Sequence, residues 1–112
     1  FKYNNITQKF SNEYKDRLKT LIDKIGKFGS EAIVITQTLS PNHILFNLLK
    51  YINEETKKVC NIKSINCLCL DDEPNFYNKV DFYDGIHTRP SGNRKIAKYI
   101  SEKIQKKLKE KI

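Results

Sequence analysis

The run Ala32-Ile33-Val34-Ile35-Thr36 is a short, continuous stretch of apolar and β-branched residues. A strand with one wet face alternates apolar and polar residues, and this run does not alternate. Continuous apolar character predicts a strand that is covered on both faces, as in a parallel sheet. A polar loop from Gln37 to Asn42 follows this strand.

The residues before this strand predict an amphipathic helix over residues 7–27. Thr7 is the expected N-cap, and Gly26 and Gly29 are expected to end the helix. Apolar side chains recur there at spacings of three and four, which is the period of one helix face. This stripe consists of Phe10, Tyr14, Leu18, Leu21, Ile22 and Ile25.

The residues after the loop predict a second helix, a second strand and a third helix. The second helix is expected to open at Pro41, to run to about Lys58 and to break at Asn61. A strand with a weaker pattern lies within residues 62–70. Pro90 opens the last helix. The residues expected to face the core from that helix are Ile96, Ala97, Ile100, Ile104 and Leu108.

The predicted order is therefore helix, strand, helix, strand, long loop, helix. Strands that alternate with helices predict an α/β fold, with right-handed crossovers and helices on both faces of a parallel sheet. Two strands alone leave sheet edges and apolar faces that need neighbours. We therefore expect residues 1–112 to be one partial domain, the C-terminal half of a three-layer α/β/α fold of flavodoxin-like type.

Composition limits the class of protein. Hydrophobic residues make up 38% and charged residues 30% of the chain, as in a soluble globular protein. No apolar run approaches the ~20 residues of a membrane span, and residues 1–10 lack the apolar region of a signal peptide. Three cysteines fit neither a paired metal motif nor a disulfide framework, so we expect small buried side chains. Free cysteines favour a reducing compartment such as the cytoplasm only weakly, and the compartment stays open.

The net charge of +8 raises the hypothesis of a non-catalytic basic module that binds nucleic acid or an anionic surface. A compositional bias toward Lys, Asn and Ile is the preferred interpretation. Only Arg17, Arg89 and Arg94 are arginines, whereas readers of phosphates and bases favour arginine. Nucleic acid is therefore not the expected partner.

The segment Asp84-Gly85-Ile86-His87 carries the most chemical content in the sequence. A carboxylate three residues before a histidine can accept a hydrogen bond from one ring nitrogen and leave the other free to take a proton. The segment follows the second strand, so it lies at the carboxyl edge of the sheet, where chemistry collects. Gln37 and Thr38 follow the first strand at the same edge and, with Ile86, are candidates to line a substrate pocket. From these residues alone, a turn and a surface histidine are equally acceptable.

With Phe82 and Tyr83 before it, and Pro90, Gly92 and an amphipathic helix after it, this segment resembles the last sequence block of the SGNH/GDSL hydrolases. The order of helices and strands over nearly all of the chain also fits that family. The resemblance implies a serine ester hydrolase in which His87 is the general base and Asp84 orients it. It implies no cofactor and no metal, and a substrate that is a small-molecule, carbohydrate or lipid ester.

The other blocks of that family do not occur in these 112 residues. Neither Gly-Asp-Ser nor Gly-x-Asn-Asp is present, and no serine of the chain has the context of the nucleophile. We therefore expect the serine and the oxyanion hole to come from the missing N-terminal half of the same domain, and the chain alone to be inactive. The acidic residues 71–73 are expected to be a turn rather than a metal cluster. Cys69 is expected to be a core residue rather than a nucleophile.

Overall fold

The computed structural model describes residues 5–38, 43–73, 80–83 and 87–110. It is a mixed α/β structure, mostly helical, with a small parallel sheet. Its elements in chain order are α1 (Asn5–Lys27), β1 (Ile33–Ile35), α2 (Phe46–Lys63), β2 (Asn66–Leu68), the 3-10 turn η1 (Leu70–Asp72) and α3 (Pro90–Glu110).

The two strands confirm the predicted parallel pairing. Ile33 lies opposite Asn66 and Ile35 lies opposite Leu68, and α2 connects the strands. The N–H of Thr36 donates to the carbonyl of Leu68 (3.0 Å), which carries the pairing one residue past β1. Among the described residues the sheet has these two strands only.

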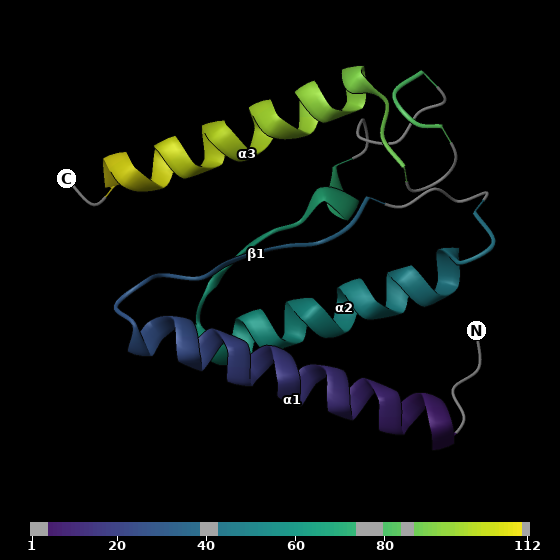
Figure 1. Cartoon of the computed structure of the whole chain (residues 1–112), viewed down its shortest axis with the longest axis vertical. Helices are drawn as coiled ribbons and strands as arrows, with labels where there is room; N and C mark the ends of the chain where they lie inside the picture. The colour runs from purple at the N-terminus through teal and green to yellow at the C-terminus, as the bar shows by residue number, and fades with distance from the viewer. Residues whose placement is uncertain (1–4, 39–42, 74–79, 84–86, 111–112) are drawn as a thin grey trace.

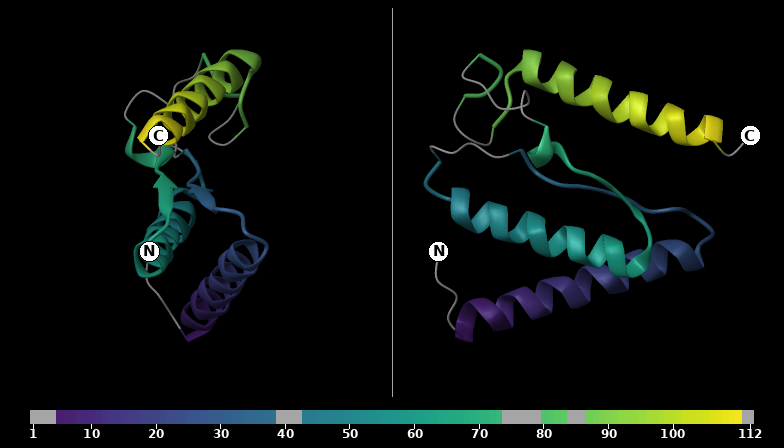
Figure 2. Two further views of the ribbon diagram at one scale, coloured as in Figure 1. Left: turned by 90° about the vertical axis from the view of Figure 1, so that its left-hand side faces the viewer. Right: turned by 180° about the vertical axis from the view of Figure 1, so that it is seen from behind.

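Helices lie on both sides of the strands (Figure 1). Helices α1 and α2 pack against each other on one side, and α3 lies on the other. The turned views of Figure 2 show the same succession of helix, strands and helices. The structure thus confirms a mixed α/β arrangement with a parallel pair of strands.

Helix α1 ends at Lys27, as predicted, but its start differs from the prediction. Helix α1 begins at Asn5, so Thr7 lies inside the helix and is not its N-cap. The helix continues through Gly26 and ends at Lys27, two residues before Gly29, whose φ of 80° lies in the left-handed region. The carbonyl of Ile25 then accepts the N–H of Ser30 (3.2 Å), which closes the end of the helix.

Helix α2 begins and ends later than predicted. It begins at Phe46, after a turn in which Nδ1 of His43 accepts the N–H of Leu45 (3.0 Å). The predicted start at Pro41 lies outside the described residues. The helix passes through Asn61 and ends at Lys63, because an exposed Asn costs a helix only a few tenths of a kcal/mol.

The core is built from α1, α2, β2, η1 and the segment before α3. Its buried apolar side chains are Ile22, Tyr51, Val59, Cys60, Leu68, Leu70 and Phe82. Helix α3 contributes less than predicted: Ile96 and Ile100 are half-buried, but Ala97 is exposed and Leu108 is 58% exposed. The prediction that the whole apolar stripe of α3 faces the core is wrong for its last turns, which the described residues leave largely uncovered. Within the described part of the chain, no helix is long and apolar enough to cross a membrane.

Candidate functional site

The carboxyl ends of β1 and β2 lie side by side, so the segments that follow them share one edge of the sheet. Thr36, the first residue after β1, is buried, and its hydroxyl donates to the carboxylate of Asp71 in η1. This bond ties the two strand ends together. No sequence pattern singled out Thr36, because a Thr that ends an apolar run looks like part of the strand.

Lys57 of α2 completes this cluster. Its Nζ lies 2.7 Å from a carboxylate oxygen of Asp71 and 2.9 Å from one of Asp72. Burial alone would lower the pKa of Lys57, but the hydrogen bonds and charges of the two carboxylates outweigh it and raise the pKa above its ordinary value. Lys57 therefore links α2 to both carboxylates of η1.

Asn53 of α2 fixes the loop after β1. Its side chain accepts the N–H of Gln37 (3.1 Å) and donates to the carbonyl of Gln37 (2.9 Å). The side chain of Gln37 is exposed and Thr38 is buried. That the two residues line a substrate pocket stays a prediction. Asn53 could have been found from the sequence. It lies four residues after Leu49, on the same face of the helix, and an Asn on a buried face needs a specific hydrogen-bond partner.

The segment that carries His87 is closed at its base by backbone hydrogen bonds. Phe82 and Thr88 form an antiparallel bridge, and the N–H of Tyr83 donates to the carbonyl of His87 (2.8 Å). The side chain of His87 is exposed. Asp84 and Ile86 lie outside the described residues, so the predicted contact of Asp84 with His87 stays a prediction.

Arg89 joins this segment to the start of α3. Its N–H donates to the carbonyl of Asp81 (2.7 Å), and its side-chain Nε–H donates to the carbonyl of Phe82 (3.2 Å). The guanidinium carbon lies 4.4 Å from the centre of the exposed Tyr83 ring. Arg89 thus holds both sides of the segment that contains His87.

Asp81 and Gly92 bring the start of the same segment into close contact with α3. A Cβ atom on Gly92 would overlap the carbonyl oxygen of Asp81, so only glycine allows this approach. Asp81 is 1% exposed, and its carboxylate accepts a hydrogen bond from Lys95 of α3. The predictions from the sequence did not include Asp81, although an acidic residue between the apolar residues Val80 and Phe82 is an exception to the local pattern.

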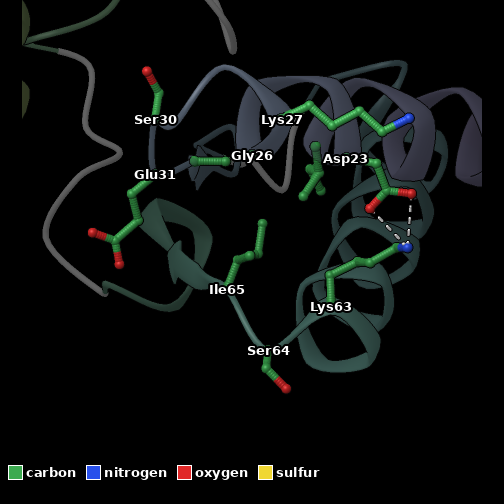
Figure 3. A pocket seen from close by; sticks show the side chains of 10 residues that line it. Asp23, Gly26, Lys27, Ser30, Glu31, Lys63, Ser64 and Ile65 are labelled. Carbon is green, nitrogen blue, oxygen red and sulfur yellow. Dashed lines mark hydrogen bonds and ion pairs between the residues drawn. The ribbon is translucent and has the colours of Figure 1, made fainter.

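A pocket of about 640 Å³ lies at the opposite end of the strands (Figure 3). The ends of α1 and α2 and the residues before each strand line it, and Asp23 and Lys63 face each other there as an ion pair (2.9 Å). In parallel sheets the chemistry is found at the carboxyl edge. This pocket at the amino edge therefore does not belong to the site around His87.

Compared with known proteins, the chain matches no family model, no curated protein and no solved structure. The residues and their arrangement are therefore the basis for assigning a function.

Proposed function

We propose that this chain is the C-terminal part of an SGNH-type serine ester hydrolase with a three-layer α/β/α fold. His87 acts as the general base, Asp84 orients it, and the serine nucleophile and the oxyanion hole come from outside these 112 residues. The observation that carries the proposal is the Asp84-x-x-His87 motif, which lies between η1 and α3 in the chain, together with Pro90 and Gly92 in the first turn of α3.

The arrangement of the helices and strands supports this proposal. A parallel pair with helices on both sides needs further strands to bury its edges, as in the rest of such a domain. The segment with His87 follows the carboxyl end of β2, the usual position of chemistry in such sheets.

The interactions that fix the backbone of the His87 segment also suit a catalytic base. A misplacement of about 1 Å can cost roughly 100-fold in rate, so a base needs a fixed backbone. Four interactions give this segment that support: the Phe82–Thr88 bridge, the two hydrogen bonds of Arg89, and the close approach of Gly92 to Asp81.

In the proposed reaction, one ring nitrogen of His87 takes the proton of the serine hydroxyl as its oxygen attacks the ester carbonyl. The imidazolium then protonates the leaving alcohol, and an acyl-enzyme remains. Water, activated by the same nitrogen, releases the acid. Asp84 keeps the ring in the productive tautomer and stabilises its positive charge. The substrate class is a carboxylic ester of a small molecule, a carbohydrate or a lipid.

The test compares two histidine variants in the full-length protein that contains this chain. His87→Ala is expected to lower kcat/KM for a short-chain aryl ester by on the order of 10⁴-fold or more. His43→Ala is the matched control, because His43 makes a local hydrogen bond before α2 and belongs to another loop. Its activity should stay within about threefold of the parent. Full activity of the His87→Ala variant would refute the assignment.

The basic-module hypothesis is the second candidate. The net charge of +8 favours it, together with exposed lysines along α3, namely Lys98, Lys103, Lys106 and Lys109. Binding to nucleic acid through such lysines weakens steeply as salt rises. A steep salt dependence, measured by fluorescence anisotropy with labelled RNA and DNA, would support this second function. No binding at low ionic strength would remove it.

A further inference from the structure

A short antiparallel pairing of the backbone surrounds the proposed base. Phe82 and Thr88 form its central bridge. On one side of this bridge, the N–H of Tyr83 donates to the carbonyl of His87 (2.8 Å). In an antiparallel pairing, residues joined by such a bond lie directly opposite each other, with Cα atoms about 5.5 Å apart. Tyr83 is therefore the direct cross-strand neighbour of His87.

Arg89 lies on the same face of this pairing as Tyr83 and His87. Successive side chains of an extended segment point to opposite faces, so residues 83, 87 and 89 share one face and residues 82 and 88 share the other. The exposure agrees with this assignment, because Phe82 is buried and Tyr83 is 64% exposed. His87 and Arg89 are exposed as well. Two residues of extended chain place the Cα atoms of His87 and Arg89 roughly 7 Å apart.

The guanidinium group of Arg89 is held over the ring of Tyr83. Its central carbon lies 4.4 Å from the centre of the ring, and its Nε–H donates to the carbonyl of Phe82 (3.2 Å). These contacts use one N–H and one face of the planar group. Among the described residues, neither terminal amino group of Arg89 has a hydrogen-bond partner.

The positive charge of Arg89 is not paired with a carboxylate of the described residues. Asp81 lies opposite Arg89 in the same pairing, since the N–H of Arg89 donates to its carbonyl (2.7 Å). The carboxylate of Asp81, however, pairs with Lys95 of α3. The terminal N–H groups of a fixed guanidinium form a fork that fits the oxygens of a carboxylate or a phosphate. Arg89 therefore has the charge and the geometry to bind such a group beside His87.

We propose that Arg89, stacked on Tyr83, binds an anionic oxygen group of the substrate, so that the esters cleaved at His87 also carry a carboxylate or a phosphate. This inference rests on the proposed hydrolase function and narrows its substrate class. Neither residue makes or breaks a bond: Arg89 fixes the anionic end of the ester, and Tyr83 holds the guanidinium group. The net charge of +8 attracts the same class of substrate.

A purely structural role of Arg89 predicts a different result. The bond from Nε to Phe82 also fixes the His87 segment, so the loss of Arg89 alone would displace the base and slow the hydrolysis of every ester alike. Binding of an anion matters only for an anionic ester. It changes KM more than kcat, because a group remote from the reacting bond is bound equally before and in the transition state. The ratio of kcat/KM between an anionic and a neutral ester therefore separates the two roles.

The test uses the full-length protein that contains this chain and two matched esters, mono-para-nitrophenyl adipate and its methyl ester, which differ in the free carboxylate. The parent should prefer the anionic ester at low ionic strength, and salt should reduce this preference. Arg89→Gln should lower the ratio of kcat/KM, anionic over neutral, by about 10- to 100-fold, mostly through KM. Arg94→Gln is the matched control, because it removes the same charge from an exposed position of α3, and it should leave the ratio unchanged.

Two variants of Tyr83 test the stacking. Tyr83→Phe keeps the ring that lies beside the guanidinium group and should keep the preference of the parent. Tyr83→Leu removes the ring and should lower the ratio by about two- to fivefold. Equal ratios in these two variants would contradict the part of the proposal that concerns Tyr83.

Competition identifies the anion. Adipate and inorganic phosphate are added separately to the reaction with the anionic ester, and the stronger inhibitor marks the preferred group, carboxylate or phosphate. Arg89→Gln should raise the inhibition constant of that anion by about tenfold or more. An inhibition constant that this substitution leaves unchanged would overturn the proposal.

Failure of the hydrolase function and failure of this inference give different results. A parent protein that cleaves neither ester refutes the hydrolase function. Binding of the mono-anilide of adipic acid, measured by isothermal titration calorimetry, then tests Arg89 by itself, and it should be weaker in Arg89→Gln than in Arg94→Gln. Cleavage of both esters with a ratio that Arg89→Gln does not change would overturn the inference and leave the hydrolase function intact. Equal binding of the anilide to the parent and to Arg89→Gln would overturn it as well.

Discussion

Replacement of Gly92 by alanine tests whether the start of α3 holds the His87 segment in place. Helix propensity alone predicts a gain, because alanine is favoured over glycine in a helix by about 1 kcal/mol. The structure predicts a loss. The new Cβ would overlap the carbonyl oxygen of Asp81 and lie 3.2 Å from its Cβ and 3.3 Å from its carbonyl carbon.

The size of the loss follows from the movement that the methyl group imposes. The Asp81 carbonyl must retreat by about 1 Å to reach a normal C···O contact of roughly 3.3 Å. That movement breaks the hydrogen bond from the N–H of Arg89 (2.7 Å). Its loss costs about 1 kcal/mol and the overpacking about 1–3 kcal/mol. After the gain in propensity, Gly92→Ala should destabilise the protein by about 1–3 kcal/mol.

Urea unfolding followed by far-ultraviolet circular dichroism measures this change. Gly26→Ala is the matched control, since it makes the same substitution in α1, where nothing lies within 4 Å of the new Cβ. It should stabilise the protein by about 0.5–1 kcal/mol. The two substitutions should therefore shift the unfolding midpoint in opposite directions at an unchanged slope. A Gly92→Ala variant as stable as the parent would refute the close contact with Asp81.

Two further predictions concern polar residues of α2. Asn53→Asp keeps the shape of the side chain but cannot donate to the carbonyl of Gln37, so urea unfolding should show a loss of about 1–3 kcal/mol. Glu55 pairs with Lys15 of α1 and with Lys58 (both 3.1 Å). Burial raises the pKa of Glu55, but these lysines outweigh it and bring the pKa below the ordinary value of 4.5. Its contribution is therefore present above pH 4.5 and is lost as the pH falls further. Glu55→Gln should lower stability by about 1–3 kcal/mol at pH 7, and the difference from the parent should vanish at acidic pH; an equal difference at both pH values would contradict the ion pairs.

The elements that follow from local pattern were predicted well. The apolar run around Val34 became β1, its parallel partner was found, and Pro90 begins α3. A run without alternation and a proline at a helix start are signals that need no tertiary context. The failures are of another kind. Ala97 and Leu108 fit the period of a buried stripe, but the period does not tell how far along α3 the neighbouring segments reach.

The candidate site was predicted in part for the same reason. The place of His87, between β2 and α3, follows from the order of the elements. The contacts that hold it, from Asp81 to Gly92 and from Arg89 to Phe82, join residues at irregular spacings, so no period reveals them. The cysteines were predicted as small buried side chains, but only Cys60 is buried, and Cys67 and Cys69 are half-buried. That Cys60 lines the same pocket as Cys67 and Cys69 depends on how α2 packs on the sheet.

We propose that His87 activates a serine that lies outside these 112 residues. Labelling of the full-length protein with a fluorophosphonate probe, followed by peptide mass spectrometry, tests it most directly, because the probe reacts with serines that a base has activated. We expect one labelled serine, outside this chain, and a loss of labelling by on the order of 10³-fold or more in His87→Ala but not in His43→Ala. A labelled serine whose reaction is undiminished in the His87→Ala variant would contradict it.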